Sequence, residues 1–181
     1  MKIGSLFELD EEYYKKACEL KEKIEIVLVG CDPYPNNAER IPFIKKSFNE
    51  LKKNHAGYKI FATIFEEEFN EISKNKTPKE LAFEMLEKKK ILLLNASYNY
   101  VQGKNRAEFH DYYIKAFEKN KKFFIKNIKI ICCGEVSNEI MKKMLDRTEG
   151  EITLKKMRHP TLRGVSLEDS IKIIRKEIYQ D

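Results

Sequence analysis

Three polar residues directly follow short apolar runs, and their types suit chemistry on a planar, polar substrate. Asp32 comes after the run 24–29, and a carboxylate in such a place can orient a water molecule or act as a base. Asn95 ends the run 91–94, and its amide offers one acceptor and two donors in one plane, which matches the edge of a nucleobase. His159 follows the segment 152–157, which has a weaker, partly alternating apolar pattern, and could donate a hydrogen bond to a developing oxyanion.

Each of the three residues also has an ordinary structural interpretation. Asp32 could cap a turn or a helix, Asn95 could form a turn at the end of a strand, and His159 could be a structural turn histidine. For Asp32 taken alone, the structural role is the more frequent one. A functional role for the three residues depends on whether the surrounding elements bring them together.

The segments around these residues are stiff and partly basic. Gly30 allows a sharp turn, and the two prolines after Asp32 restrict the loop that carries it. Two arginines, Arg158 and Arg163, flank the histidine segment and could hold phosphate groups. The other two histidines lack such a setting, and we expect both to be surface residues.

The apolar runs predict four buried strands that alternate with helices. The predicted strands are 24–29, 91–94, 128–133 and 152–157. The predicted helices are 11–20, 42–51, 77–86, 109–123, 138–145 and 167–179, with Thr77 and Ser166 as N-caps, and 59–65 could be a fifth strand or the start of a helix. Continuous apolar runs are typical of parallel strands covered on both faces. The pattern predicts one α/β domain over 1–181, a three-layer α/β/α sandwich around a four-stranded, mostly parallel sheet.

In such a sheet the loops at the carboxyl ends of the strands build the site. This places the segments 30–37, 95–100 and 158–164 around one crevice, with 134–137 beside them. Asp32, Asn95 and His159 would then share a single pocket.

Composition narrows the function classes. The chain has 35 basic and 29 acidic residues, a net charge of +6, which mildly favours a polyanionic partner. The four cysteines lack CxxC spacing, so a zinc or iron–sulfur site is not expected. No apolar run is long enough to span a membrane, and the first ten residues do not resemble a secretory signal. We expect a cytoplasmic protein without a membrane partner.

Taken together and in order, the three segments resemble the motifs of the uracil-DNA glycosylase superfamily. Residues 27–34, VLVGCDPY, resemble the family's VILGQDPYH, and residues 91–96, ILLLNA, resemble its VLLLNA. The HPT that begins at His159 resembles the start of HPSPLS, and Cys133-Gly134 falls where the family has Trp-Gly. The resemblance spans about residues 24 to 165.

The resemblance implies hydrolysis of the N-glycosidic bond of uracil in single- or double-stranded DNA, by a monomer without metal or cofactor, on a flipped base. Asp32 and His159 would be catalytic, the first positioning water and stabilising the sugar cation, the second stabilising the uracil anion. Asn95 would read the uracil edge, Tyr34 would fill the space of a thymine methyl group, and the backbone near Cys31 would contact the base. The DNA-binding residues would be Arg158, Leu162 and Arg163.

Several positions depart from the family pattern. Cys31 replaces the family's glutamine and Pro35 its histidine, while Arg163 stands in the place of the DNA-inserting leucine, with Leu162 one residue earlier. The loop with the stacking aromatic of GLCFS is shortened, and the nearest aromatic, Phe43, is expected to be a core residue of the helix 42–51. Two alternatives follow: a superfamily member that binds a nucleic acid, nucleotide or protein without catalysis, and another α/β enzyme acting on a small molecule.

Overall fold

The computed structural model describes residues 9–34, 39–99, 110–125, 127–146, 152–161 and 164–180. A four-stranded sheet lies at its centre, in the order β2-β1-β3-β4, and every neighbouring pair is parallel. The strands are β1 (Ile26–Gly30), β2 (Ile91–Asn95), β3 (Lys129–Cys133) and β4 (Thr153–Met157). The four strands predicted from the apolar runs are confirmed, and the sheet is wholly parallel.

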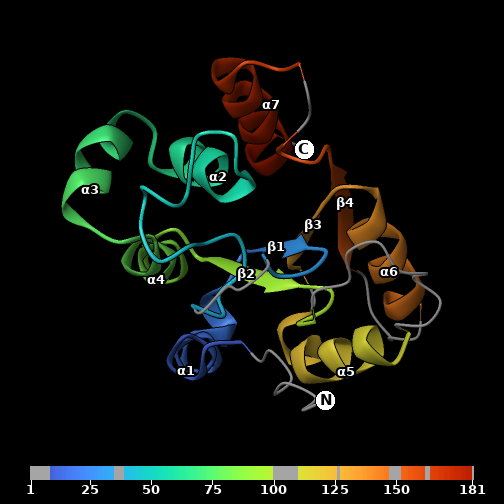
Figure 1. Ribbon diagram of the computed structural model, residues 1–181. Helices are drawn as coiled ribbons and strands as arrows, with labels where there is room; N and C mark the ends of the chain where they lie inside the picture. Colours follow the sequence, from blue (N-terminus) through green and yellow to red (C-terminus); the bar gives the residue numbers. More distant parts are fainter. Residues whose placement is uncertain are drawn as a thin grey trace, which may run out of the picture.

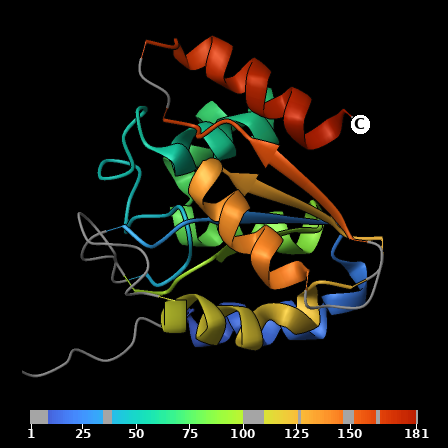
Figure 2. The same ribbon diagram turned by 90° about the vertical axis from the view of Figure 1, so that its right-hand side faces the viewer.

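Helices cover both faces of this sheet, which confirms the three-layer sandwich. They are α1 (Glu11–Glu19), α2 (Ala56–Phe65), α3 (Phe69–Asn75), α4 (Pro78–Lys88), α5 (His110–Asn120), α6 (Glu135–Leu145) and α7 (Leu167–Tyr179). Helices α2 and α7 lie over one face, and α1 and α5 lie over the other (Figure 1). The segments that follow the strands gather at one end of the sheet, on the left of Figure 2.

The burial of the strands explains their sequence. Val27, Leu28 and all residues of β2 except Asn95 are at most 1% exposed, because β1 and β2 are covered from both sides. In β4 the residues Thr153 and Lys156 are exposed, although β2, at the opposite edge of the sheet, is buried along its whole length.

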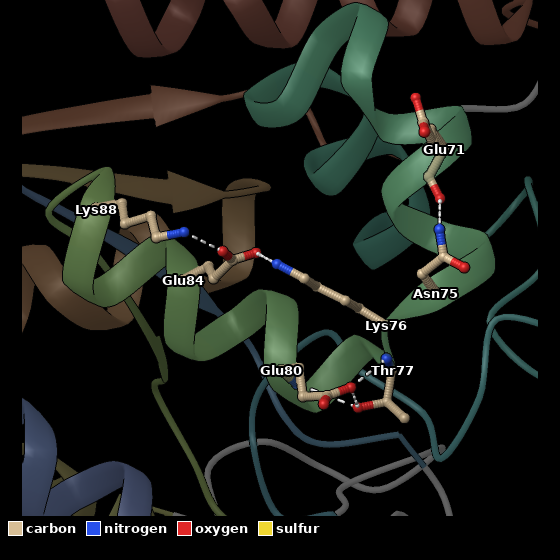
Figure 3. A network of polar contacts seen from close by, with 7 residues as sticks. All are labelled: Glu71, Asn75, Lys76, Thr77, Glu80, Glu84 and Lys88. Carbon is tan, nitrogen blue, oxygen red and sulfur yellow. Dashed lines mark hydrogen bonds and ion pairs between the residues drawn. The ribbon is translucent and has the colours of Figure 1, made fainter.

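Polar contacts fix the junction between α3 and α4 (Figure 3). The Thr77 hydroxyl accepts a hydrogen bond from the backbone N–H of Glu80, and the Glu80 carboxylate accepts one from the backbone N–H of Thr77 at 2.6 Å. This capping box satisfies two free donors at the start of α4. Glu84, one turn later, pairs with Lys76 at 2.8 Å and also with Lys88. The N-cap predicted at Thr77 is confirmed.

Helix α7 is held at both ends. The Ser166 hydroxyl accepts a hydrogen bond from the backbone N–H of Asp169 at 3.1 Å, so the N-cap predicted there is confirmed. At the other end, Lys129 donates to the Ile178 carbonyl at 3.2 Å, and Lys155 donates to the Gln180 carbonyl at 2.8 Å. Lysines at the carbonyl end of a helix satisfy its free acceptors and complement its dipole.

Two predictions for the segment before α4 need correction or completion. The helix predicted for 42–51 is wrong: the segment forms turns, and Phe43 has a left-handed backbone with φ 68°. Its apolar side chains are drawn into the core at irregular spacing, with Ile44 and Leu51 fully buried, and this packing overrides the helical pattern. Residues 59–65 belong to α2 and not to a fifth strand.

Candidate functional site

The ends of β1 and β2 continue to pair beyond the strands. The backbone N–H of Ala96 donates to the Gly30 carbonyl at 2.8 Å, and that of Ser97 donates to the Cys31 carbonyl at 2.9 Å. These bonds hold the segment of Cys31 and Asp32 beside the segment that follows Asn95. Cys31 and Asp32 are both half-buried.

Asn95 lies directly opposite Gly30 in the sheet and is 4% exposed. A methyl group on Gly30 would lie 2.4 Å from the Asn95 Oδ1 atom, so the amide occupies the space that the glycine leaves open. Among the described residues, Gly30 and Phe43 approach this amide. An amide in this position can offer both an acceptor and donors to a ligand.

Phe43 lies beside this amide, which the sequence did not predict. The Cζ atom of its ring would be 2.9 Å from the same methyl group on Gly30, so the ring tip and the Asn95 amide lie within a few ångströms of each other. Its left-handed backbone is uncommon for a bulky residue and has to be held by its surroundings. The carbonyl of Phe43 abuts Gly57, where any side chain would collide with it. In the sequence, Phe43 lies shortly after the DPY segment. The helix wrongly predicted for 42–51 led to its interpretation as a core residue of that helix.

The Tyr34 ring contacts Lys45 and His55, the second of which is the N-cap residue of α2. The Lys45 Nζ atom lies 4.7 Å from the ring centroid, and the His55 ring lies 5.4 Å away. The Tyr34 hydroxyl accepts a hydrogen bond from the backbone N–H of Gly57 at 3.4 Å, and burial raises its pKa to about 12. The tyrosine is therefore neutral and fixed.

His55 is half-buried against it, so the prediction of a plain surface residue is wrong, while the side chain of His110 lies outside the described residues.

His159 lies between β4 and α7 and packs on the start of α6. A methyl group on Gly134, which has φ 104°, would lie 3.3 Å from the His159 Cδ2 atom. The Gly134 N–H donates to the Met157 carbonyl at 2.9 Å, which ties this glycine to the end of β4. Only a residue without a side chain combines this backbone conformation with such a close approach.

The hydrogen bonds of the imidazole indicate its tautomer. The backbone N–H of Thr161 donates to Nδ1 at 3.3 Å, and the Thr161 hydroxyl lies 2.7 Å from the same atom. A backbone N–H can only donate, so Nδ1 accepts and the proton of the neutral ring is on Nε2. Partial burial lowers the pKa of His159; the Asp32 carboxylate opposes this shift, and the Lys59 ammonium adds to it. The site thus presents a neutral N–H donor that feels both Asp32 and Lys59.

The remaining predicted residues divide into two groups. Arg158 is exposed next to His159. Leu162 and Arg163 lie outside the described residues, so their assignment as DNA-binding residues stays a prediction. Lys59, which the sequence analysis did not single out, is buried on α2 and contributes to the charge around His159.

Two further properties of the described residues concern metal binding and membrane crossing. In that part of the chain no three His, Cys, Asp or Glu side chains are grouped so that they could hold a metal ion. None of the described helices combines the length and the apolar character needed to cross a membrane. No protein-family model matches the chain, and no curated protein sequence matches it.

Proposed function

We propose that this protein is a DNA glycosylase of the uracil-DNA glycosylase type, which hydrolyses the N-glycosidic bond of uracil or a related base. The observation that carries the proposal is the arrangement at Gly30, where a nearly buried amide lies beside an aromatic ring tip. An amide in the plane of a base and a ring against its face are the two contacts that a flipped pyrimidine needs.

Base recognition follows from these two side chains. The Asn95 amide can donate to a carbonyl of the base and accept from its N–H at the same edge. Phe43 supplies the aromatic surface that the shortened loop lacked in the sequence comparison. Tyr34, neutral and held by Gly57, would limit the space beside a bound base and disfavour a base with an extra methyl group.

The chemistry assigns opposite charges to opposite sides of the breaking bond. As the bond lengthens, positive charge develops on the sugar and negative charge on the base. The Asp32 carboxylate stabilises the cationic sugar and orients the water that attacks it. His159 donates its Nε2 proton as a hydrogen bond to the anionic base, and a neutral imidazole does this without first protonating the leaving group.

Exposed lysines on the segment that leads to α2 support a nucleic acid as the partner. Lys46, Lys52 and Lys53 are exposed, and no described carboxylate forms an ion pair with them. Many other lysines of the protein, such as Lys16 and Lys79, do pair with carboxylates. Unpaired cations beside the site can contact phosphates, and binding that relies on such contacts weakens steeply as salt concentration rises.

Excision from a fluorescent oligonucleotide with one uracil tests the proposal. The strand is cleaved at abasic sites by alkali, and both single-stranded and double-stranded forms are used, with a thymine strand as the matched substrate control. Accumulation of cleaved uracil strand above the level of the Asp32→Asn variant supports the glycosylase. No excision above that level contradicts it, and salt-dependent DNA binding without excision would favour a binding protein.

Replacing Phe43 by leucine should weaken the protein's use of uracil DNA while keeping an apolar side chain in the core. Loss of base stacking costs about 1–3 kcal/mol, so kcat/KM should fall roughly 5- to 150-fold. The measurement is steady-state excision, with circular dichroism to verify folding. Phe48→Leu is the matched control, since Phe48 packs on Phe61 and Phe69, away from Asn95. Equal losses in both variants would mean that Phe43 serves only the core.

A further inference from the structure

Lys59 is a buried lysine whose hydrogen-bond partner is a hydroxyl group. It is 5% exposed, and its Nζ atom donates a hydrogen bond to the Ser170 hydroxyl at 2.9 Å. No carboxylate in the described part of the chain forms an ion pair with it. Burying an ammonium group without an opposite charge costs free energy. The burial of the Lys59 ammonium group therefore needs an explanation other than core packing.

The hydrogen bond of Lys59 reaches the loop that carries His159. Ser170 accepts from the lysine and donates its own hydroxyl proton to the Ser166 carbonyl at 2.8 Å. Ser166 is the N-cap of α7 and ends the loop that begins after β4. Helix α2, which carries Lys59, packs against α7 on the same face of the sheet (Figure 1).

The described residues on either side of 162–163 are each held by contacts. Before them, Gly134 bonds to the Met157 carbonyl and packs on the His159 ring. After them, Lys59 holds the first turn of α7 through Ser170.

The charged groups around His159 come from different elements. Asp32, after β1, favours the protonated imidazole, whereas Lys59 on α2 disfavours it and so lowers its pKa. On α6 the Glu135 carboxylate is engaged by Lys156, and on α7 the Asp169 carboxylate accepts from the Ser166 hydroxyl. Asp32 and Lys59 are therefore the two opposing charges that act on the ring.

We propose that Lys59 is a positioning residue for His159: through Ser170 it holds the first turn of α7, the helix that follows the histidine segment, and its ammonium is one of the charges that act on the ring. The neutral ring retains the Nε2 proton that would be donated to the leaving base. This consequence for excision rests on the proposed function, whereas the effect of Lys59 on His159 does not.

Titration of His159 by ¹⁵N NMR tests the charge directly, without any substrate. The variants are Lys59→Met, which removes the charge, and Lys59→Arg, which keeps it, and a His159→Gln protein identifies the signal among the three histidines. In the methionine variant the titration midpoint should move to higher pH, and in the arginine variant it should stay near that of the wild type. An unchanged midpoint in folded Lys59→Met, or in Lys59→Gln if the first variant does not fold, overturns the proposal.

Excision kinetics test the second part. If neutral His159 is the active form, activity falls as the pH drops through its pKa, so the acid limb of kcat should move to higher pH in Lys59→Met. Ser170→Ala keeps the charge but removes the anchor, and it should lower kcat without moving that limb. Wild-type kinetics in Ser170→Ala would overturn the anchoring role. If the wild type excises no base, the proposed function fails, and the NMR titration still decides the role of Lys59.

Discussion

Asp32→Asn is expected to lose uracil excision almost completely, with kcat lower by about 10²- to 10⁴-fold at neutral pH. Asparagine keeps the size of the side chain but removes its negative charge. It can neither accept a proton from the attacking water nor stabilise the cation that develops on the sugar. Single-turnover excision from a single-stranded uracil oligonucleotide measures the chemical step.

Folding and DNA binding should survive this substitution. Asp32 is half-buried after the end of β1, so the variant should unfold within a few degrees of the wild type. Asp111→Asn is the matched control, because Asp111 is exposed in the first turn of α5 and should leave kcat unchanged. If Asp32→Asn retained more than a third of the wild-type rate, Asp32 would not be the group that assists hydrolysis.

The part of the fold that the sequence predicts is the part governed by burial along the chain. The runs at Ile26–Gly30 and Ile91–Asn95 are apolar at consecutive positions because helices cover both faces of the sheet. This pattern is local, so the strands and the parallel sheet follow from it. The caps at Thr77 and Ser166 are equally local, and both are confirmed.

The features that the sequence did not predict depend on contacts between distant segments. Phe43 has a left-handed backbone because its carbonyl meets Gly57 and its ring reaches Gly30, and no spacing within 42–51 encodes these contacts. Lys59 is buried because it meets Ser170, which lies 111 residues later. From the sequence alone, Phe43 is predicted to be a helix residue, and Lys59 looks like an ordinary lysine. The three polar residues at the strand ends could be singled out because strand ends are local features, and their roles stay predictions.

Gly57→Ala is expected to destabilise the protein by at least about 3 kcal/mol, at the upper end of the usual cost of overpacking. In an exposed helix the same change would stabilise by about 1 kcal/mol, because alanine is the better helix former. Here the new methyl group would lie 1.7 Å from the Phe43 carbonyl oxygen and 2.8 Å from its carbon. Backbone atoms cannot turn aside as a side chain does, so either Phe43 or the start of α2 has to move.

Thermal and urea unfolding measure this effect, and a loss of 3 kcal/mol corresponds to a Tm lower by roughly 6–12 °C for a chain of this size. Gly164→Ala is the matched control: its φ of 79° makes alanine strained, but no atom lies within 4 Å of the added methyl group. That variant should lose only about 1–2 kcal/mol. The Gly57→Ala protein should also bind uracil DNA poorly, because Tyr34 and Phe43 both depend on this glycine for their positions. Equal stability of the two alanine variants would show that the first turn of α2 yields easily and does not fix these side chains.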